Sequence, residues 1–108
     1  MRRFALLLML WPMVAAADWQ ALSGPEIEAA LSGQRLIYEK AWQEFRPSGR
    51  TLYNAGRDSW GYWQVRDDAY CSQWPPSDLW TCYRVEVDGS LIRFLGEAGD
   101  VTEARYTR

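Results

Sequence analysis

The chain has 108 residues, of which 48% are hydrophobic and 15% aromatic, and its formal net charge is −2. Lys40 is its only lysine, so the chain lacks the clustered basic residues of nucleic-acid-binding proteins, and we expect no nucleic-acid partner. It contains no histidine, which excludes Ser-His-Asp catalysis, Cys-His catalysis and any histidine general base.

The first 17 residues have the organisation of a secretory signal peptide. Arg2 and Arg3 form a basic start, an apolar run covers residues 4–14, and the alanines at 15–17 provide a small-residue cleavage site. A membrane span needs roughly 20 apolar residues, so an uncleaved anchor is the weaker alternative. We predict cleavage after Ala17, a periplasmic or secreted location and no stable membrane span. The single small exported domain would comprise residues 18–108, with ten basic and fourteen acidic residues and a net charge of −4.

Several helix-start signals agree just after the cleavage site. Ser23 and Glu26 form an S-x-x-E capping box, and Pro25 falls in the first turn, where its missing N–H costs nothing. Gly33 is placed to end the helix in a left-handed conformation. We predict a helix over residues 24–32, which is too short to be stable unless it packs on the rest of the domain.

After this helix, turn signals recur every eight to ten residues and separate short segments rich in Trp, Tyr, Val, Ile and Thr. The predicted strands cover residues 34–39, 42–46, 50–55, 60–66, 69–74, 79–87, 90–95 and 101–107. The expected fold class is mainly β (α+β). A short N-terminal helix would pack on an antiparallel meander sheet or a small barrel of seven or eight strands with one disulfide.

Two turns predict the register of the hairpins. Asp88-Gly89 is typical of a two-residue type I′ loop, and Asp67-Asp68 is a less typical loop because it lacks glycine. The first loop would pair Val87 with Ser90, Val85 with Ile92 and Tyr83 with Phe94. The second would pair Arg66 with Ala69 and Val65 with Tyr70.

Cys71 and Cys82 flank a four-residue loop at 75–78 if they lie directly opposite each other on neighbouring strands. That register also pairs Tyr70 with Tyr83, on the face already predicted to be internal. A redox C-x-x-C motif is absent, and a zinc site would need further ligands in a chain without histidine. We therefore predict a disulfide that stabilises the hairpin by about 2–3 kcal/mol.

The carboxylates do not form a recognisable catalytic or metal-binding set. Glu97, Asp100 and Glu103 surround a glycine-rich turn, but they lack the alternating Asp/Asn pattern of a calcium loop. We expect no enzymatic activity, no catalytic residue, no metal site and no cofactor, and a hydrolase that uses carboxylates is the third-ranked alternative.

The chain resembles a group of short exported alphaproteobacterial proteins of unknown function. The resemblance depends on the stretch "LSGPEIEAALSG", on "GRTLY" and "GYW", and on the cysteine followed by "WTC". It covers most of residues 18–108 and implies an exported helix-plus-sheet domain. It implies no catalytic residues.

The tryptophans and arginines suggest two functions. The register turns Trp63 and Trp74 inward. It gathers Arg66, Arg84, Arg93, Tyr62 and Trp80 on the outer face, with Arg84 directly opposite Arg93. These outer side chains are a candidate binding site for an anionic ligand or an envelope protein, unless Asp67, Asp68 and Glu86 simply neutralise the arginines in solvent.

The first functional hypothesis is thus a non-catalytic periplasmic or secreted binding or inhibitor-like module with an Arg/aromatic outer surface. The alternative is a small lipocalin-like carrier of an apolar or amphipathic ligand. An interior filled by Trp63, Tyr70, Tyr83 and Phe94 would exclude the carrier, so the state of the interior distinguishes the two hypotheses.

Overall fold

The computed structural model describes residues 18–107, and the predicted signal peptide and its cleavage site lie outside the described residues. Nine strands form one antiparallel sheet, in which eight strands close into a barrel and one short strand is added. The elements are β1 (Gln20–Ala21), α1 (Gly24–Leu31), β2 (Gln34–Ile37), β3 (Trp42–Phe45), β4 (Arg50–Asn54), β5 (Asp58–Arg66), β6 (Ala69–Gln73), β7 (Trp80–Asp88), β8 (Leu91–Leu95) and β9 (Val101–Tyr106).

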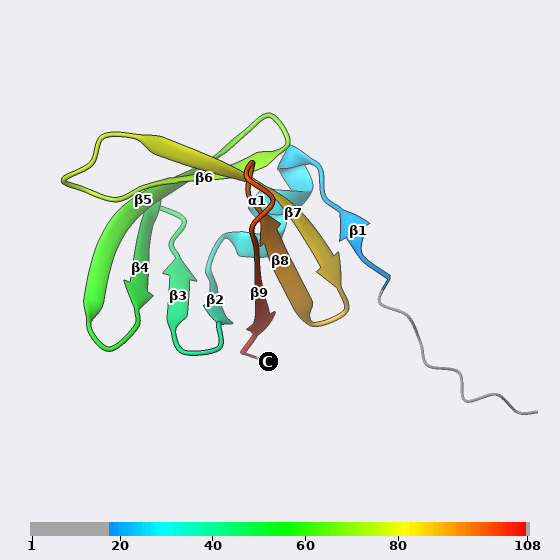
Figure 1. Ribbon diagram of the computed structural model, residues 1–108, viewed down its shortest axis with the longest axis horizontal. Coiled ribbons are helices and arrows are strands. Elements are labelled where there is room, and N and C mark those ends of the chain that lie inside the picture. Colours follow the sequence, from blue (N-terminus) through cyan, green and yellow to red (C-terminus); the bar gives the residue numbers. More distant parts are fainter. Residues whose placement is uncertain (1–17, 108) are drawn as a thin grey trace, which may run out of the picture.

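The barrel is a simple meander, because each strand from β2 to β9 pairs with the next strand in the chain. It closes where β9 returns beside β2, so β9 lies between β2 and β8 (Figure 1). This closing seam is short, with only Leu36–Tyr106 and Ile37–Arg105 as paired residues. The predicted fold class is confirmed, and the structure selects the barrel over the open sheet.

The strand predictions agree with the structure to within two residues at each end. The strand they missed is β1, which pairs Gln20 with Val87 and Ala21 with Glu86. It lies beside the second half of β7, beyond the residues of β7 that pair with β6. A two-residue strand is too short to produce a recognisable alternation pattern.

Helix α1 closes one end of the barrel. Its capping box is present as predicted, and Gly33 follows the helix with a φ of 78°. Ile27 and Leu31 are fully buried in the core together with Phe45 and Trp63. The backbone N–H of Gly24 donates to Oδ1 of Asp68 over 2.7 Å, which ties the first turn of the helix to the β5–β6 turn. None of the described helices is long and apolar enough to span a bilayer.

The predicted disulfide between Cys71 and Cys82 is confirmed, and these residues are direct cross-strand partners on β6 and β7. The pairs that flank it, Tyr70–Tyr83 and Gln73–Trp80, are also the predicted ones. A disulfide is consistent with an oxidising, extracytoplasmic compartment. The Asp67-Asp68 hairpin has its predicted register as well, and Asp67 takes the positive φ that the turn requires.

The predicted register of the β7–β8 hairpin is wrong. The last pair is Asp88–Leu91, so the loop consists of Gly89 and Ser90. A type I′ loop at Asp88-Gly89 would need positive φ at both residues, whereas Gly89 has a φ of 62° and Asp88 stays in the strand. The error is a shift of two residues, which leaves every side chain on its predicted face. Val85 and Val87 therefore still point inward, opposite Phe94 and Ile92.

Candidate functional site

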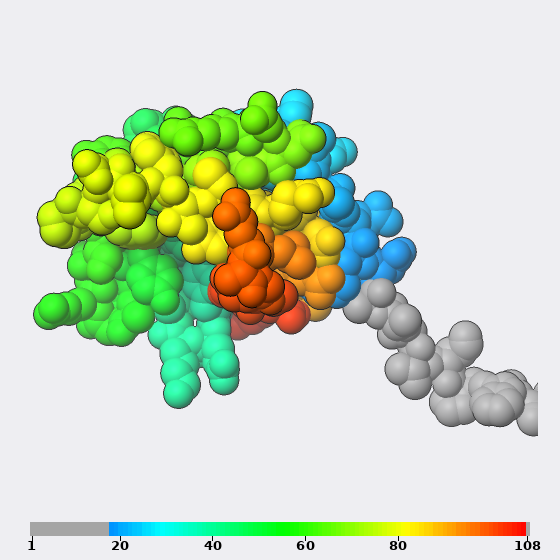
Figure 2. All heavy atoms as spheres, turned by 45° about the horizontal axis from the view of Figure 1, so that its top comes forward, coloured from blue at the N-terminus to red at the C-terminus, as the bar shows by residue number. Residues whose placement is uncertain are grey.

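The end of the barrel opposite α1 contains a cavity of about 650 Å³. Its lining comes from strands β3 to β9, from Tyr38 directly after β2, and from the β6–β7 loop. Figure 2 shows the β8–β9 turn (orange) and the β6–β7 hairpin (yellow) standing out from one face of the molecule. The lining residues are Tyr38, Gln43, Tyr53, Ser59, Trp60, Tyr70, Ser72, Trp74, Pro75, Tyr83, Phe94 and Thr102.

Aromatic rings form two groups in the wall of this cavity. In the first group, the ring centroid of Tyr53 lies 6.0 Å from that of Tyr38 and 6.1 Å from that of Trp74. In the second, Tyr70 lies 6.1 Å from Tyr83 and 5.1 Å from Phe94. The tilted and edge-on arrangements are those that aromatic pairs favour.

Trp74 forms part of the wall because position 61 is a glycine. A Cβ atom at Gly61 would lie 2.6 Å from Cε3 of Trp74 and 2.7 Å from the carbonyl oxygen of Gln73. The indole Nε1 of Trp74 donates to Oγ of Ser72 over 3.2 Å, which orients the ring across the inner face of the sheet. The prediction that Trp63 and Trp74 point inward is confirmed, but only Trp63 is buried in the core.

A network of hydrogen bonds lies on the inner face of the barrel around Gln43, which is buried. Oε1 of Gln43 accepts a hydrogen bond from the Tyr38 hydroxyl over 2.6 Å. Its Nε2 donates to Oγ1 of Thr51 over 2.9 Å and to the hydroxyl oxygen of Tyr70 over 3.3 Å. Gln43 therefore has partners for both ends of its amide, and the network connects β3 with β4 and β6.

The tyrosines of this network remain protonated over the physiological pH range. Burial raises the pKa of Tyr70 to about 12. Hydrogen bonds with Ser72 and Gln43 lower this pKa, but their effect is smaller than that of burial. Burial likewise raises the pKa of the Tyr38 hydroxyl. Both groups act here as neutral hydrogen-bonding side chains.

Two tyrosine hydroxyls in the lining have no partner within the described part of the chain, and neither do the hydroxyls of Ser59 and Thr102. Among residues 18–107, the hydroxyls of Tyr53 and Tyr83 form no hydrogen bond, and every buried side-chain nitrogen or oxygen atom has a partner. The free tyrosine hydroxyls are therefore accessible, and they come from different strands, β4 and β7. They can donate to or accept from a molecule that enters the cavity.

A groove of about 640 Å³ lies beside the cavity, between the β2–β3 turn and β9. It shares Tyr38, Tyr53 and Thr102 with the cavity. It lies where β9 has no paired residue on β2, because pairing at the seam covers only Arg105 and Tyr106 of β9. The groove differs from the cavity in having charged lining residues, which are Glu39, Lys40, Glu103 and Arg105.

The candidate site predicted on the outer face is rearranged by the corrected register. Arg93 lies opposite Glu86, not Arg84, and its guanidinium forms an ion pair with Oε1 of Glu86 over 2.7 Å. Arg84 lies opposite Leu95, so the prediction that Arg84 faces Arg93 is wrong. The physical reason is the Gly89-Ser90 loop, which places a carboxylate opposite Arg93 and removes the unfavourable pair of like charges.

The other residues of that predicted site lie on the outer face of β5 and β7. Tyr62 and Trp80 share one cross-strand row through Gln73, as predicted. The guanidinium of Arg66 lies 5.2 Å from the ring centroid of Trp80. Arg93 lies 4.2 Å from the ring of Trp19, so the arginines predicted to form one site stack on separate aromatic residues.

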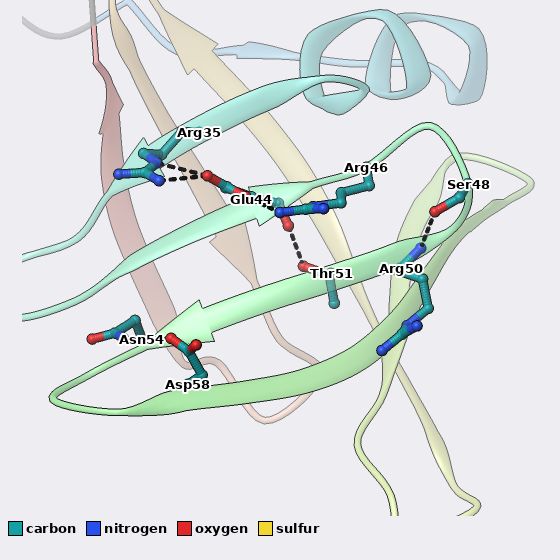
Figure 3. A network of polar contacts seen from close by, with 8 residues as sticks. All are labelled: Arg35, Glu44, Arg46, Ser48, Arg50, Thr51, Asn54 and Asp58. Atoms are coloured by element: carbon teal, nitrogen blue, oxygen red, sulfur yellow. Dashed lines mark hydrogen bonds and ion pairs between the residues drawn. The ribbon is translucent and has the colours of Figure 1, made fainter.

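A second polar arrangement on the outer face was not predicted. Glu44 accepts hydrogen bonds from Arg35 and Arg46 on either side, and these bonds hold the pKa of its carboxyl group below the usual range (Figure 3). Beside this network, the guanidinium groups of Arg46 and Arg50 lie 5.1 Å and 4.6 Å from the ring of Trp60. The signal that could have found it is the antiparallel register of β2 to β5, for which we derived no cross-strand pairs from the sequence.

Comparisons with protein families, curated proteins and solved structures found no significant match to this chain. The resemblance to short exported alphaproteobacterial proteins stays a prediction. Within residues 18–107, no three His, Cys, Asp or Glu side chains are grouped so that they could hold a metal ion.

A ligand-holding interior was predicted from the sequence only as the alternative, the small lipocalin-like carrier, and its place at one end of the barrel was not predicted. Inward positions near the helix hold large side chains such as Phe45 and Trp63. Inward positions at the other end include the small residues Ser59, Gly61 and Ser72. The two serines leave room between the aromatic side chains at the same end, such as Tyr53 and Tyr83.

Proposed function

We propose that the protein binds a small apolar or amphipathic molecule inside its barrel and acts as an exported, non-catalytic carrier. The observation that carries this proposal is the cavity of about 650 Å³, whose wall consists mainly of aromatic side chains. Small-molecule sites usually have volumes of about 300–1,000 Å³, with apolar walls and a few placed polar groups.

The aromatic residues whose packing would exclude a carrier fill only the helix side of the barrel, and the cavity lies beyond them at the other end. Trp63, Tyr70 and Phe94 belong to the buried core and Tyr83 packs against it, while Tyr70, Tyr83 and Phe94 also form the inner wall of the cavity. Open mouths of small antiparallel barrels are common positions for ligand sites. These points favour the carrier over the binding module that we placed first from the sequence.

The binding or inhibitor-like module remains the second candidate. It is favoured by the exposure of Trp60 (40%) and Tyr62 (43%) beside the guanidinium group of Arg50. Aromatic and arginine side chains are the residues that most often dominate protein–protein interfaces.

A fluorescent probe and one pair of variants test the carrier. The probe is N-phenyl-1-naphthylamine, whose emission rises in apolar surroundings, titrated into mature protein with an intact disulfide. Ser59→Trp adds a large side chain at the cavity wall, whereas Ser90→Trp places the same side chain in the β7–β8 turn at the other end of the barrel. Both serines are exposed, so neither substitution should prevent folding.

The carrier proposal expects saturable binding to the parent protein, binding weakened about tenfold or more in Ser59→Trp, and unchanged binding in Ser90→Trp. Absence of saturable binding to the parent protein would contradict the proposal. Equal binding to both variants would contradict it too, because the probe would then lie outside the cavity.

A further inference from the structure

Every side chain that lines the barrel cavity is uncharged at neutral pH. The lining consists of aromatic residues, hydroxyl residues, Gln43 and Pro75, and no Asp, Glu, Lys or Arg belongs to it. The charged residues next to it line the neighbouring groove, beyond the shared residues Tyr38, Tyr53 and Thr102, or lie on the outer face. On the outer face, Arg46 and Arg50 stack on Trp60.

This lack of charge decides which ligands the cavity can hold. A carboxylate, a phosphate or an ammonium group loses its hydration when it enters an apolar cavity, and only an opposite charge or several hydrogen bonds can offset that loss. Carboxylates and phosphates are usually bound by arginine, whose guanidinium fork matches their geometry. The cavity presents no guanidinium, ammonium or carboxylate group for this purpose.

Neutral polar groups, by contrast, have suitable partners in the cavity. The free hydroxyls of Tyr53 and Tyr83 can each donate one hydrogen bond and accept another. A hydroxyl or carbonyl group of a ligand satisfies such a partner without carrying charge into the barrel. The Gln43 network does not compete for these hydroxyls, because its bonds connect Tyr38, Thr51 and Tyr70.

We infer that the ligand of the barrel cavity is an uncharged, mainly apolar molecule that carries hydroxyl or carbonyl groups. The inference deepens the proposed carrier function and rests on it. Fatty-acid carboxylates, phosphate groups and amines do not enter the inner cavity. A charge on the ligand is tolerated only where it reaches the groove at Glu39, Lys40, Glu103 and Arg105.

Three naphthalene derivatives that share one ring system test the inference. The neutral probe is 2-naphthalenemethanol, the anion is 2-naphthoate and the cation is 2-naphthylmethylammonium. The charge is next to the ring in each ion, so a ring that packs between the two aromatic groups brings its charge close to the uncharged lining. Binding to mature protein at neutral pH is measured by calorimetry, with Ser59→Trp as the blocked-cavity variant.

We expect the alcohol to bind about tenfold or more tightly than either ion, and Ser59→Trp to lose that preference. If an ion binds as tightly as the alcohol and Ser59→Trp abolishes its binding, the inference is overturned while the carrier function survives. If an ion binds to Ser59→Trp as tightly as to the parent protein, its site lies outside the cavity. The inference then holds, because only the alcohol binds inside the cavity. If none of the three binds, the carrier function itself fails and the inference fails with it.

A gain-of-function variant provides the converse test. Thr102→Arg places a guanidinium group at the rim of the cavity, where Thr102 is exposed, whereas Ser90→Arg adds the same charge at the opposite end. Thr102→Arg should increase the affinity for 2-naphthoate about tenfold relative to 2-naphthalenemethanol, and Ser90→Arg should not change the ratio. An unchanged ratio in Thr102→Arg would show that the uncharged lining does not set the preference.

Discussion

The indole ring of Trp74 occupies the space in which a side chain at Gly61 would lie. Gly61 is buried on the inner face of β5, and a Cβ atom there would lie 2.6 Å from the ring of Trp74. The absence of a side chain at this position allows the β6–β7 loop to turn its tryptophan into the barrel. The wall of the cavity therefore depends on a glycine that does not itself line it.

The variant Gly61→Ala should displace Trp74 and the adjoining carbonyl group of Gln73. Overpacking of this kind costs about 1–3 kcal/mol of unfolding free energy, which urea titration will measure. Near-ultraviolet circular dichroism should change with the position of the indole ring, and affinity for N-phenyl-1-naphthylamine should fall. A variant with parent-like stability and affinity would show that Trp74 does not depend on Gly61.

The tyrosines of the cavity should divide into two classes. Tyr53→Phe and Tyr83→Phe remove hydroxyls without a protein partner, so the unfolding free energy should change by less than about 0.5 kcal/mol. Tyr38→Phe removes the donor to the buried amide oxygen of Gln43 and should cost about 1–3 kcal/mol. Calorimetry with 2-naphthalenemethanol should show weaker binding to Tyr53→Phe or Tyr83→Phe. The opposite pattern of stabilities would contradict the hydrogen-bond network.

Alkaline pH should destabilise the barrel through Tyr70. Its pKa is raised by burial to about 12 from an ordinary value of 10.0, so the unfolded chain releases this proton first. The stability is thus fully present below pH 10 and decreases as the pH rises from 10 towards 12. Unfolding free energies across this range should fall less steeply in Tyr70→Phe than in the parent protein. Parallel curves would mean that Tyr70 is not the group responsible.

The disulfide should stabilise the hairpin that carries Trp74 and the mouth of the cavity. Replacing Cys71 and Cys82 together by serine should lower the unfolding free energy by about 2–3 kcal/mol, because the bond closes a short loop. Thiol titration is the control: the native protein should contain no reactive thiol. Reaction of both cysteines with a maleimide without denaturant would contradict the bond.

The sequence predicted the strands well because turn residues mark nearly every boundary. Its main register error, at Asp88 and Gly89, came from assigning a loop type by composition, whereas the backbone conformation of Asp88, which stays in the strand, decides it. Closure of the barrel was left open, because the pairing of β9 with β2 joins residues about 70 positions apart and has no local signal.

The candidate site was predicted less well than the fold. The outer arginines were chosen from a row that depended on the incorrect register, and Arg93 proved to be paired with Glu86. The cavity depends on volumes summed around the whole barrel: the small side chains of Ser59 and Ser72 leave space, whereas the space at Gly61 is filled by Trp74. No single sequence motif reveals this total volume.

The most direct test of the carrier is a crystal structure of the mature protein with N-phenyl-1-naphthylamine bound. The account predicts that the naphthyl ring lies between the group formed by Tyr38, Tyr53 and Trp74 and the group formed by Tyr70, Tyr83 and Phe94. A probe bound outside the barrel, on the exposed ring of Tyr62, with the cavity holding only water, would contradict it.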